Sequence, residues 1–165
     1  MEESIQLLRK TIELSEDTDS DLPSYLSRLA SNLGSRFAIL GHIEDLEEGI
    51  RLGRQAITTS RISEVQRATL YNKLAALLHQ RFVEGGTLFD IDEAIKLTAT
   101  GVSLASEQDP PRGIYAFELG GHYLEKYART RDDDVVMDAM RGYKIAIDQP
   151  SGQIRQRISA SAMAM

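Results

Sequence analysis

The sequence predicts an all-α protein built as an α-solenoid of antiparallel helix pairs. Apolar residues recur at spacings of three, four and seven along most of the 165-residue chain, a pattern typical of amphipathic helices. The same pattern returns every 45 residues. No segment shows a sustained alternation of apolar and polar residues, so no strand is expected. A fixed period of this length, with two helices in each period, is typical of an α-solenoid.

Helix boundaries follow from apolar stripes and from proline and glycine signals. Ile5, Leu8 and Ile12 form one stripe in the first helix, and Pro23 suits the first turn of the second. Gly41 and Gly85 are expected to end the second and the fourth helix. About seven or eight helices are expected, over residues 1–15, 22–40, 44–60, 64–84, 90–106, 110–130, 132–147 and 153–165.

The period appears in large apolar residues and in small ones. The large positions 45 residues apart are Ile5, Ile50, Ile95 and Met140; Leu29, Leu74 and Leu119; and Phe37, Phe82 and Tyr127. The small positions are Ser4, Gly49, Ala94 and Ala139; Thr11, Ala56, Gly101 and Ala146; and Ala30, Ala75 and Gly120. Because these last columns contain only small residues, we expect two helices to approach closely there. The chain is therefore expected to be one repeat array, with units at 1–21 (half a repeat), 22–63, 64–110, 111–151 and 152–165 (half a repeat).

At these positions the sequence resembles the tetratricopeptide (TPR) family. The first helix of the second unit, helix A, has Leu74 followed by the small Ala75, and its helix B has the small residues Ala94 and Gly101, seven apart. The TPR period is 34 residues. The gap from the small residue of helix A to that of helix B is 19 here (Ala30 to Gly49) and 12 in TPR, so the match needs a helix A about two turns longer. The resemblance implies a right-handed superhelix. The run D-I-D-E-A-I at 90–95 is also similar to long-period TPR arrays of fungal proteins that end in a caspase-like CHAT domain, a domain that this chain does not contain.

In TPR arrays helix A forms most of the inner, concave wall, which binds peptides. The resemblance places on this wall Asn72, His79, Ile114, Phe117 and Leu124, together with small residues. A concave apolar patch of this kind is a credible peptide site. In the alternative interpretation the longer helix A is rotated, and Phe117 belongs to the core.

A basic column, Arg36, Arg81 and Lys126, is a second candidate site. Cations 45 residues apart would lie side by side on successive repeats and could bind an acidic tail. In the alternative interpretation these cations favour the helix dipole and are neutralised by acidic residues near Glu48 and Glu93.

Composition limits the other classes of function. A net charge of −6 argues against a nucleic-acid partner, and no apolar run is long enough to span a membrane. The absence of cysteine favours the cytoplasm. His42, His79 and His122 fall in different columns and form no recognised metal-binding pair, so we expect no metal, no cofactor and no catalytic residue.

The sequence therefore predicts a non-enzymatic scaffold that binds a protein or peptide on its helix-A face. The alternative is that the array is the regulatory or sensor part of a larger enzyme, such as a CHAT-type protease or an immune-receptor-like protein. No polar capping repeat is visible at either end, so we also expect the ends to join a longer array or to pair with a second copy.

Overall fold

A computed structural model describes residues 1–16, 18–58 and 62–150 of the chain. These residues form seven helices and no strand, as the sequence predicts. The helices are α1 (Glu2–Leu14), α2 (Leu22–Leu40), α3 (Ile43–Ile57), α4 (Glu64–Val83), α5 (Leu88–Leu104), α6 (Pro110–Thr130) and α7 (Asp133–Asp148). The eighth helix expected at 153–165 lies outside the described residues.

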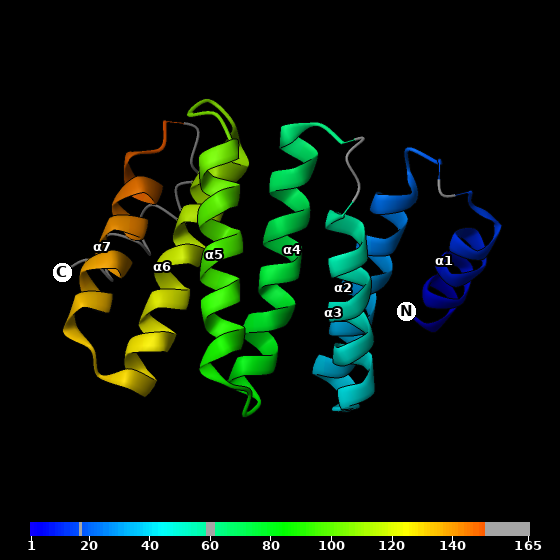
Figure 1. The fold of residues 1–165 in the computed structure, drawn as a ribbon, viewed down its shortest axis with the longest axis horizontal. Helices are drawn as coiled ribbons and strands as arrows, with labels where there is room; N and C mark the ends of the chain where they lie inside the picture. Colours follow the sequence, from blue (N-terminus) through cyan, green and yellow to red (C-terminus); the bar gives the residue numbers. More distant parts are fainter. Residues whose placement is uncertain (17, 59–61, 151–165) are drawn as a thin grey trace.

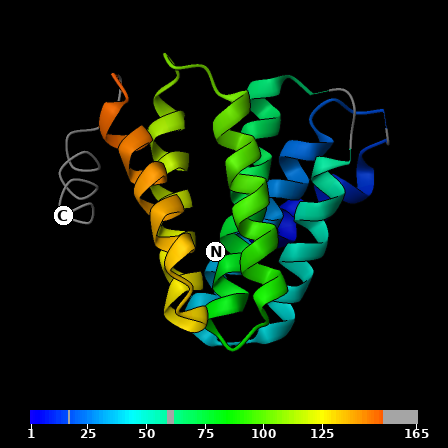
Figure 2. The ribbon, with the colours of Figure 1, turned by 60° about the vertical axis from the view of Figure 1, so that its left-hand side comes forward.

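The helices follow one another along the long axis of the molecule, with α1 at one end and α7 at the other (Figure 1). Each helix packs against the next one in the chain, and α2 also contacts α4 directly. The α4–α5 and α6–α7 connections lie at the lower ends of these helices, and the α5–α6 connection lies at their upper ends (Figure 2). Two helices begin slightly before their predicted starts: α3 begins at Ile43 instead of residue 44, and α5 begins at Leu88 instead of residue 90.

The core repeats with the period seen in the sequence. Leu33 and Leu78 are fully buried, and Leu46 and Ile91 are too. The column that begins at Ile5 ends differently, because Met140 on α7 is 41% exposed. Within the described residues α7 is the last helix, and no helix after it covers this side chain.

The small-residue columns mark close contacts between helices. A Cβ atom added to Gly49 would lie 3.1 Å from the carbonyl oxygen of Ala30, and one added to Gly101 would lie 3.3 Å from that of Ala68. Ala94 in the same set is completely buried. A larger side chain at these positions would therefore push two backbones apart.

Replacing Ala94 by leucine is expected to destabilise the fold by about 2 kcal/mol, because three extra carbon atoms must enter a filled space. Chemical denaturation would measure the change. Ala128 is exposed on α6, and Ala128→Leu should stay within about 0.5 kcal/mol of the parent. Equal stability of the two variants would show that the Ala94 column is not a tight helix contact.

Candidate functional site

The even-numbered helices α2, α4 and α6 are the ones that the sequence predicts to begin the three complete units, and hydrogen bonds join them side by side. The Gln80 amide donates to the carbonyl oxygen of Gly34 (3.4 Å) and thereby links α4 to α2. The hydroxyls of Thr69 and Tyr115 (3.2 Å) link α4 to α6. We call the surface formed by these three helices the even-helix wall.

Three hollows lie along the even-helix wall. The first α2–α4 hollow, of about 310 Å³, is lined by Ser27, Arg28 and Lys73 among others. The second α2–α4 hollow, of about 280 Å³, includes Lys73 and Ala76 in its lining. The α4–α6 hollow, of about 250 Å³, is lined by Ala76, His79, Phe117, Glu118, Gly121, His122 and Glu125. Because neighbouring hollows share Lys73 and Ala76 in their linings, the three hollows adjoin one another, and we call them together the path across the wall.

The α4–α6 hollow contains an imidazole pair. The rings of His79 on α4 and His122 on α6 have centroids 4.8 Å apart. Glu118, His122 and Glu125 share one face of α6 because their spacings are four and three residues. At the edge of this face the Asn72 amide donates a hydrogen bond of 2.6 Å to the Glu118 carboxylate.

The structure brings together some of the predicted binding residues. His79 and Phe117 line the α4–α6 hollow, and Asn72 reaches it through Glu118. Ile114 and Leu124 are partly buried against the core and do not line this hollow. Phe117 has features of both a core residue and a binding residue. Its ring packs with the centroid 5.5 Å from that of Tyr143 on α7, and the same side chain lines the α4–α6 hollow.

Sequence reasoning missed Glu118, His122 and Glu125. Hydrogen bonds between neighbouring even-numbered helices join residues 46 apart, one more than the repeat: Gly34 with Gln80, Thr69 with Tyr115, and Asn72 with Glu118. The ring contact between His79 and His122 joins residues 43 apart, so these two histidines do not occupy the same column of the repeat. An offset of one residue between adjacent repeats would have predicted Glu118 opposite Asn72.

Burial controls the ionisation of this site. The pKa of His122 falls to about 3, chiefly because the ring is desolvated and secondly because His79 is near. Burial also lowers the pKa of His79, against the opposing effect of Glu125. Burial raises the pKa of the Glu118 carboxyl, partly offset by the hydrogen bond from Asn72. Both imidazoles are therefore neutral at pH 7 and can donate or accept a hydrogen bond.

The free energy of unfolding is expected to fall as the pH drops below about 6.5. The unfolded state protonates His122 near that pH, whereas the folded state protonates it only near 3, so the unfolded state binds more protons in between. At pH 5 this difference amounts to about 2 kcal/mol. The raised pKa of Glu118 acts in the opposite direction as that carboxylate becomes protonated. Urea denaturation at pH 7 and pH 5 would measure the loss, and His122→Gln should reduce it. A loss that is the same in both proteins would contradict the assignment to His122.

Unpaired polar atoms gather on the same wall. Among the described side chains, four contain a buried nitrogen or oxygen atom that has no hydrogen-bond partner: Ser27, Asn72, His79 and Thr98. Ser27 lines the first α2–α4 hollow, His79 lines the α4–α6 hollow, and Asn72 lies beside Glu118. A buried polar atom without a partner destabilises the fold, so three of these four sites would gain from a bound hydrogen-bonding group.

The basic column lies in ion pairs within the chain. Its partners are themselves periodic, and most of them are acids close to Glu48 and Glu93 in the sequence, as the alternative interpretation predicts. Arg36 pairs with Glu2 (2.6 Å) and Asp45 (2.6 Å), Arg81 with Glu47 (2.9 Å) and Asp90, and Lys126 with Asp92 (2.8 Å). Glu48 and Glu93 pair instead with Arg9 (2.6 Å) and Arg54 (2.7 Å), which join α1 to α3 and α3 to α5. The column thus connects successive helices.

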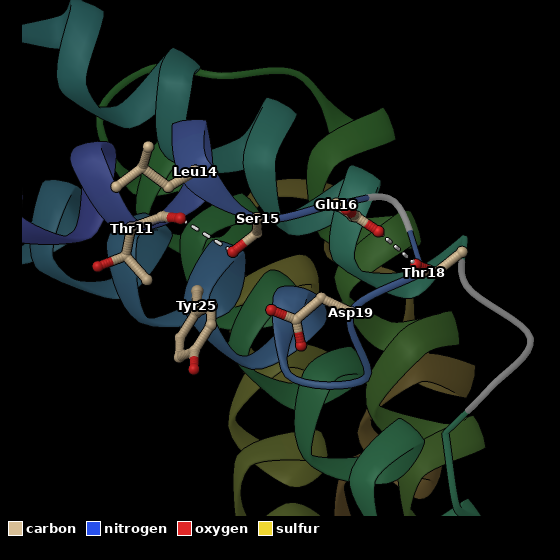
Figure 3. A pocket seen from close by; sticks show the side chains of 7 residues that line it. All are labelled: Thr11, Leu14, Ser15, Glu16, Thr18, Asp19 and Tyr25. Carbon is tan, nitrogen blue, oxygen red and sulfur yellow. Dashed lines mark hydrogen bonds between the residues drawn. The ribbon is translucent and has the colours of Figure 1, made fainter.

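A larger hollow, of about 490 Å³, lies between the end of α1 and the start of α2 (Figure 3). Its polar groups are bound locally: the Ser15 hydroxyl donates to the Thr11 carbonyl oxygen (2.9 Å), and Asp19 accepts from the Asp21 N–H (2.8 Å). Leu14 on its rim is 75% exposed. This hollow therefore offers fewer free polar groups than the even-helix wall. Within the described ranges no group of three or more side chains is placed to bind a metal ion.

No model of a known protein family matches the chain, and no curated protein or solved structure matches it. In the part of the chain that the structure describes, no helix combines the length and hydrophobicity needed to cross a membrane. The geometry of the even-helix wall is thus the basis for a functional assignment.

Proposed function

We propose that the chain is a non-enzymatic, TPR-like α-solenoid scaffold that binds a peptide or protein segment along the even-helix wall. The observation that carries this proposal is the path of three adjoining hollows beside buried polar atoms that have no partner. The wall consists of the first helices of the repeats, which are the helices that TPR arrays use for binding. The proposed place of action is the cytoplasm, consistent with a chain that has no cysteine.

The lining of the path suits a polypeptide. Ala76 and Gly121 have little or no side chain and leave room for a main chain to approach the helices. The neutral imidazole of His79 can pair with a backbone N–H or C=O group, which needs a partner when it is buried. Phe117 offers an apolar surface to a side chain of the ligand.

The ends of the row support a further part of the proposal. Leu7 and Leu14 on α1 are 67% and 75% exposed, and Met137 on α7 is 54% exposed. Apolar side chains of this size are stabilised by a covering helix. We therefore propose that the outer faces of α1 and α7 contact further repeats or a second copy of the chain.

Selection of a random peptide library on the chain would test the binding function. Ala76 is exposed and borders two hollows, so Ala76→Arg should block the path without entering the core. Ala128→Arg, at an exposed position on α6 that lines none of the three hollows, is the matched control. We expect selected peptides to bind Ala76→Arg at least about tenfold more weakly and to bind the control normally. Selected peptides that bind both variants equally would contradict a site on the even-helix wall.

A further inference from the structure

Four charged residues line the three hollows of the even-helix wall: Arg28, Lys73, Glu118 and Glu125. None of them belongs to any of the ten ion pairs formed among the described residues. The periodic cations Arg36 and Arg81, in contrast, each have two carboxylate partners. The charged residues that line the hollows thus differ from the periodic cations in having no ion-pair partner among the described residues.

The two signs of charge are separated on this wall. Arg28 and Lys73 line the α2–α4 hollows, whereas Glu118 and Glu125 line the α4–α6 hollow. Ala76 on α4 borders a hollow of each kind and places only a methyl group between them. The path across α4 therefore leads from a positive region to a negative one.

Burial makes the unpaired state unfavourable at the two inner positions. Desolvation, together with the nearby Arg28, lowers the pKa of Lys73, and desolvation raises the pKa of Glu118. In both residues the protein environment disfavours the charged form. Glu118 accepts a hydrogen bond from the neutral Asn72 amide, which supplies no compensating charge. An opposite charge at each position would stabilise the ionised form.

We propose that the even-helix wall recognises a peptide segment that carries one acidic and one basic side chain. The acidic side chain pairs with Lys73, close to Arg28, and the basic side chain pairs with Glu118 and Glu125. This inference rests on the proposed function and adds the chemistry of the ligand. Phe117 lines the same hollow as the two carboxylates, so the stem or guanidinium of an arginine can pack against its ring.

The geometry also limits the spacing of the two ligand charges. Packed helices lie about 8–10 Å apart, and the two kinds of hollow lie on opposite sides of α4. An extended chain advances about 3.3 Å per residue. An extended segment crossing α4 would therefore carry its acidic and basic residues about three positions apart.

Peptides selected on the chain provide the test, because each charged side chain of a peptide can be replaced by a neutral one of nearly the same shape. Replacing the arginine of a peptide by citrulline removes the charge and keeps the shape. We expect this change to weaken binding to the parent chain at least about tenfold, and to have little effect on binding to a variant with Glu118→Gln and Glu125→Gln. Replacing the peptide aspartate by asparagine should likewise weaken binding to the parent and have little effect on Lys73→Met.

Controls separate charge recognition from folding and from long-range electrostatics. The Glu118→Gln substitution keeps a side-chain oxygen that can accept the hydrogen bond from Asn72, and circular dichroism would confirm that each variant remains folded. Glu64 and Lys96 are exposed and line none of the three hollows, so Glu64→Gln and Lys96→Gln should leave affinity unchanged.

The outcomes distinguish the two proposals. Peptides that lose binding in Ala76→Arg but bind equally well with citrulline and asparagine would overturn the charge pairing and leave the scaffold function standing. Peptides whose binding is indifferent to Ala76→Arg, or the absence of any selected peptide, would overturn both. The inference would be established if the citrulline change weakened binding only when Glu118 and Glu125 are present, and the asparagine change only when Lys73 is present.

Discussion

Gly142→Ala is expected to destabilise the fold by about 3 kcal/mol, because the added methyl group would meet backbone on the facing helix. A Cβ atom at Gly142 would lie 2.8 Å from the nitrogen of Gly120, 3.0 Å from its Cα atom and 3.1 Å from the carbonyl oxygen of Ala116. A flexible side chain could turn away, whereas these atoms move only if α6 and α7 separate. Thermal and urea unfolding would measure the loss.

Gly121→Ala is the matched control on the facing helix. The Cβ atom of this variant would come within 4 Å of only one other group, the Tyr143 hydroxyl at 3.9 Å, which is ordinary van der Waals contact. Alanine is favoured over glycine within helices, so Gly121→Ala should stabilise the chain by up to about 1 kcal/mol. The two substitutions should therefore change stability in opposite directions. A stabilising effect of both would show that α6 and α7 are farther apart than the structure places them.

Asp90→Ala is expected to destabilise the fold by about 3 kcal/mol. The Asp90 carboxylate is buried, accepts hydrogen bonds from the Arg81 guanidinium and also accepts one from the backbone N–H of Thr87 (3.0 Å) at the start of α5. Its loss would leave Arg81 with the exposed Glu47 alone and would remove a helix cap. Chemical denaturation at pH 7 would measure the effect.

Asp92→Ala is the control for Asp90 because it removes the same kind of side chain two positions later. Asp92 pairs with Lys126 at 2.8 Å, but its side chain is 51% exposed. An exposed pair contributes less than about 1 kcal/mol, so Asp92→Ala should have a small effect. Similar losses in the two variants would mean that burial of the Asp90 pair contributes little.

Much of the helical organisation was predictable because it depends on local patterns. The period of 45 residues placed Leu33 and Leu78 in corresponding core positions, and the small residues indicated where backbones approach, as Gly49 does at Ala30. Met140 occupies the same column as the buried Ile50 and Ile95 but is 41% exposed among the described residues, because the period of a sequence does not by itself fix how much of a side chain its neighbours cover.

The candidate site was only partly predictable. His79 and Phe117 followed from the resemblance to TPR helix A, but Glu118 required the offset between adjacent helices, and His122 required the ring contact between them. The basic column was visible in the sequence, whereas its partners depended on where long side chains reach. Arg81 binds Glu47 and Asp90 from two different helices, and Glu93 pairs with Arg54.

The sequence by itself determined that this protein is helical, where its helices lie and how often their pattern returns, because hydrophobic periodicity and turn residues act over short distances. Only the tertiary structure decided that adjacent helices of the even-helix wall are offset by one residue beyond the repeat. That offset results from side-chain packing between helices. The same packing brings two neutral imidazoles together beside an unpaired carboxylate and leaves Lys73 without an ion-pair partner among the described residues.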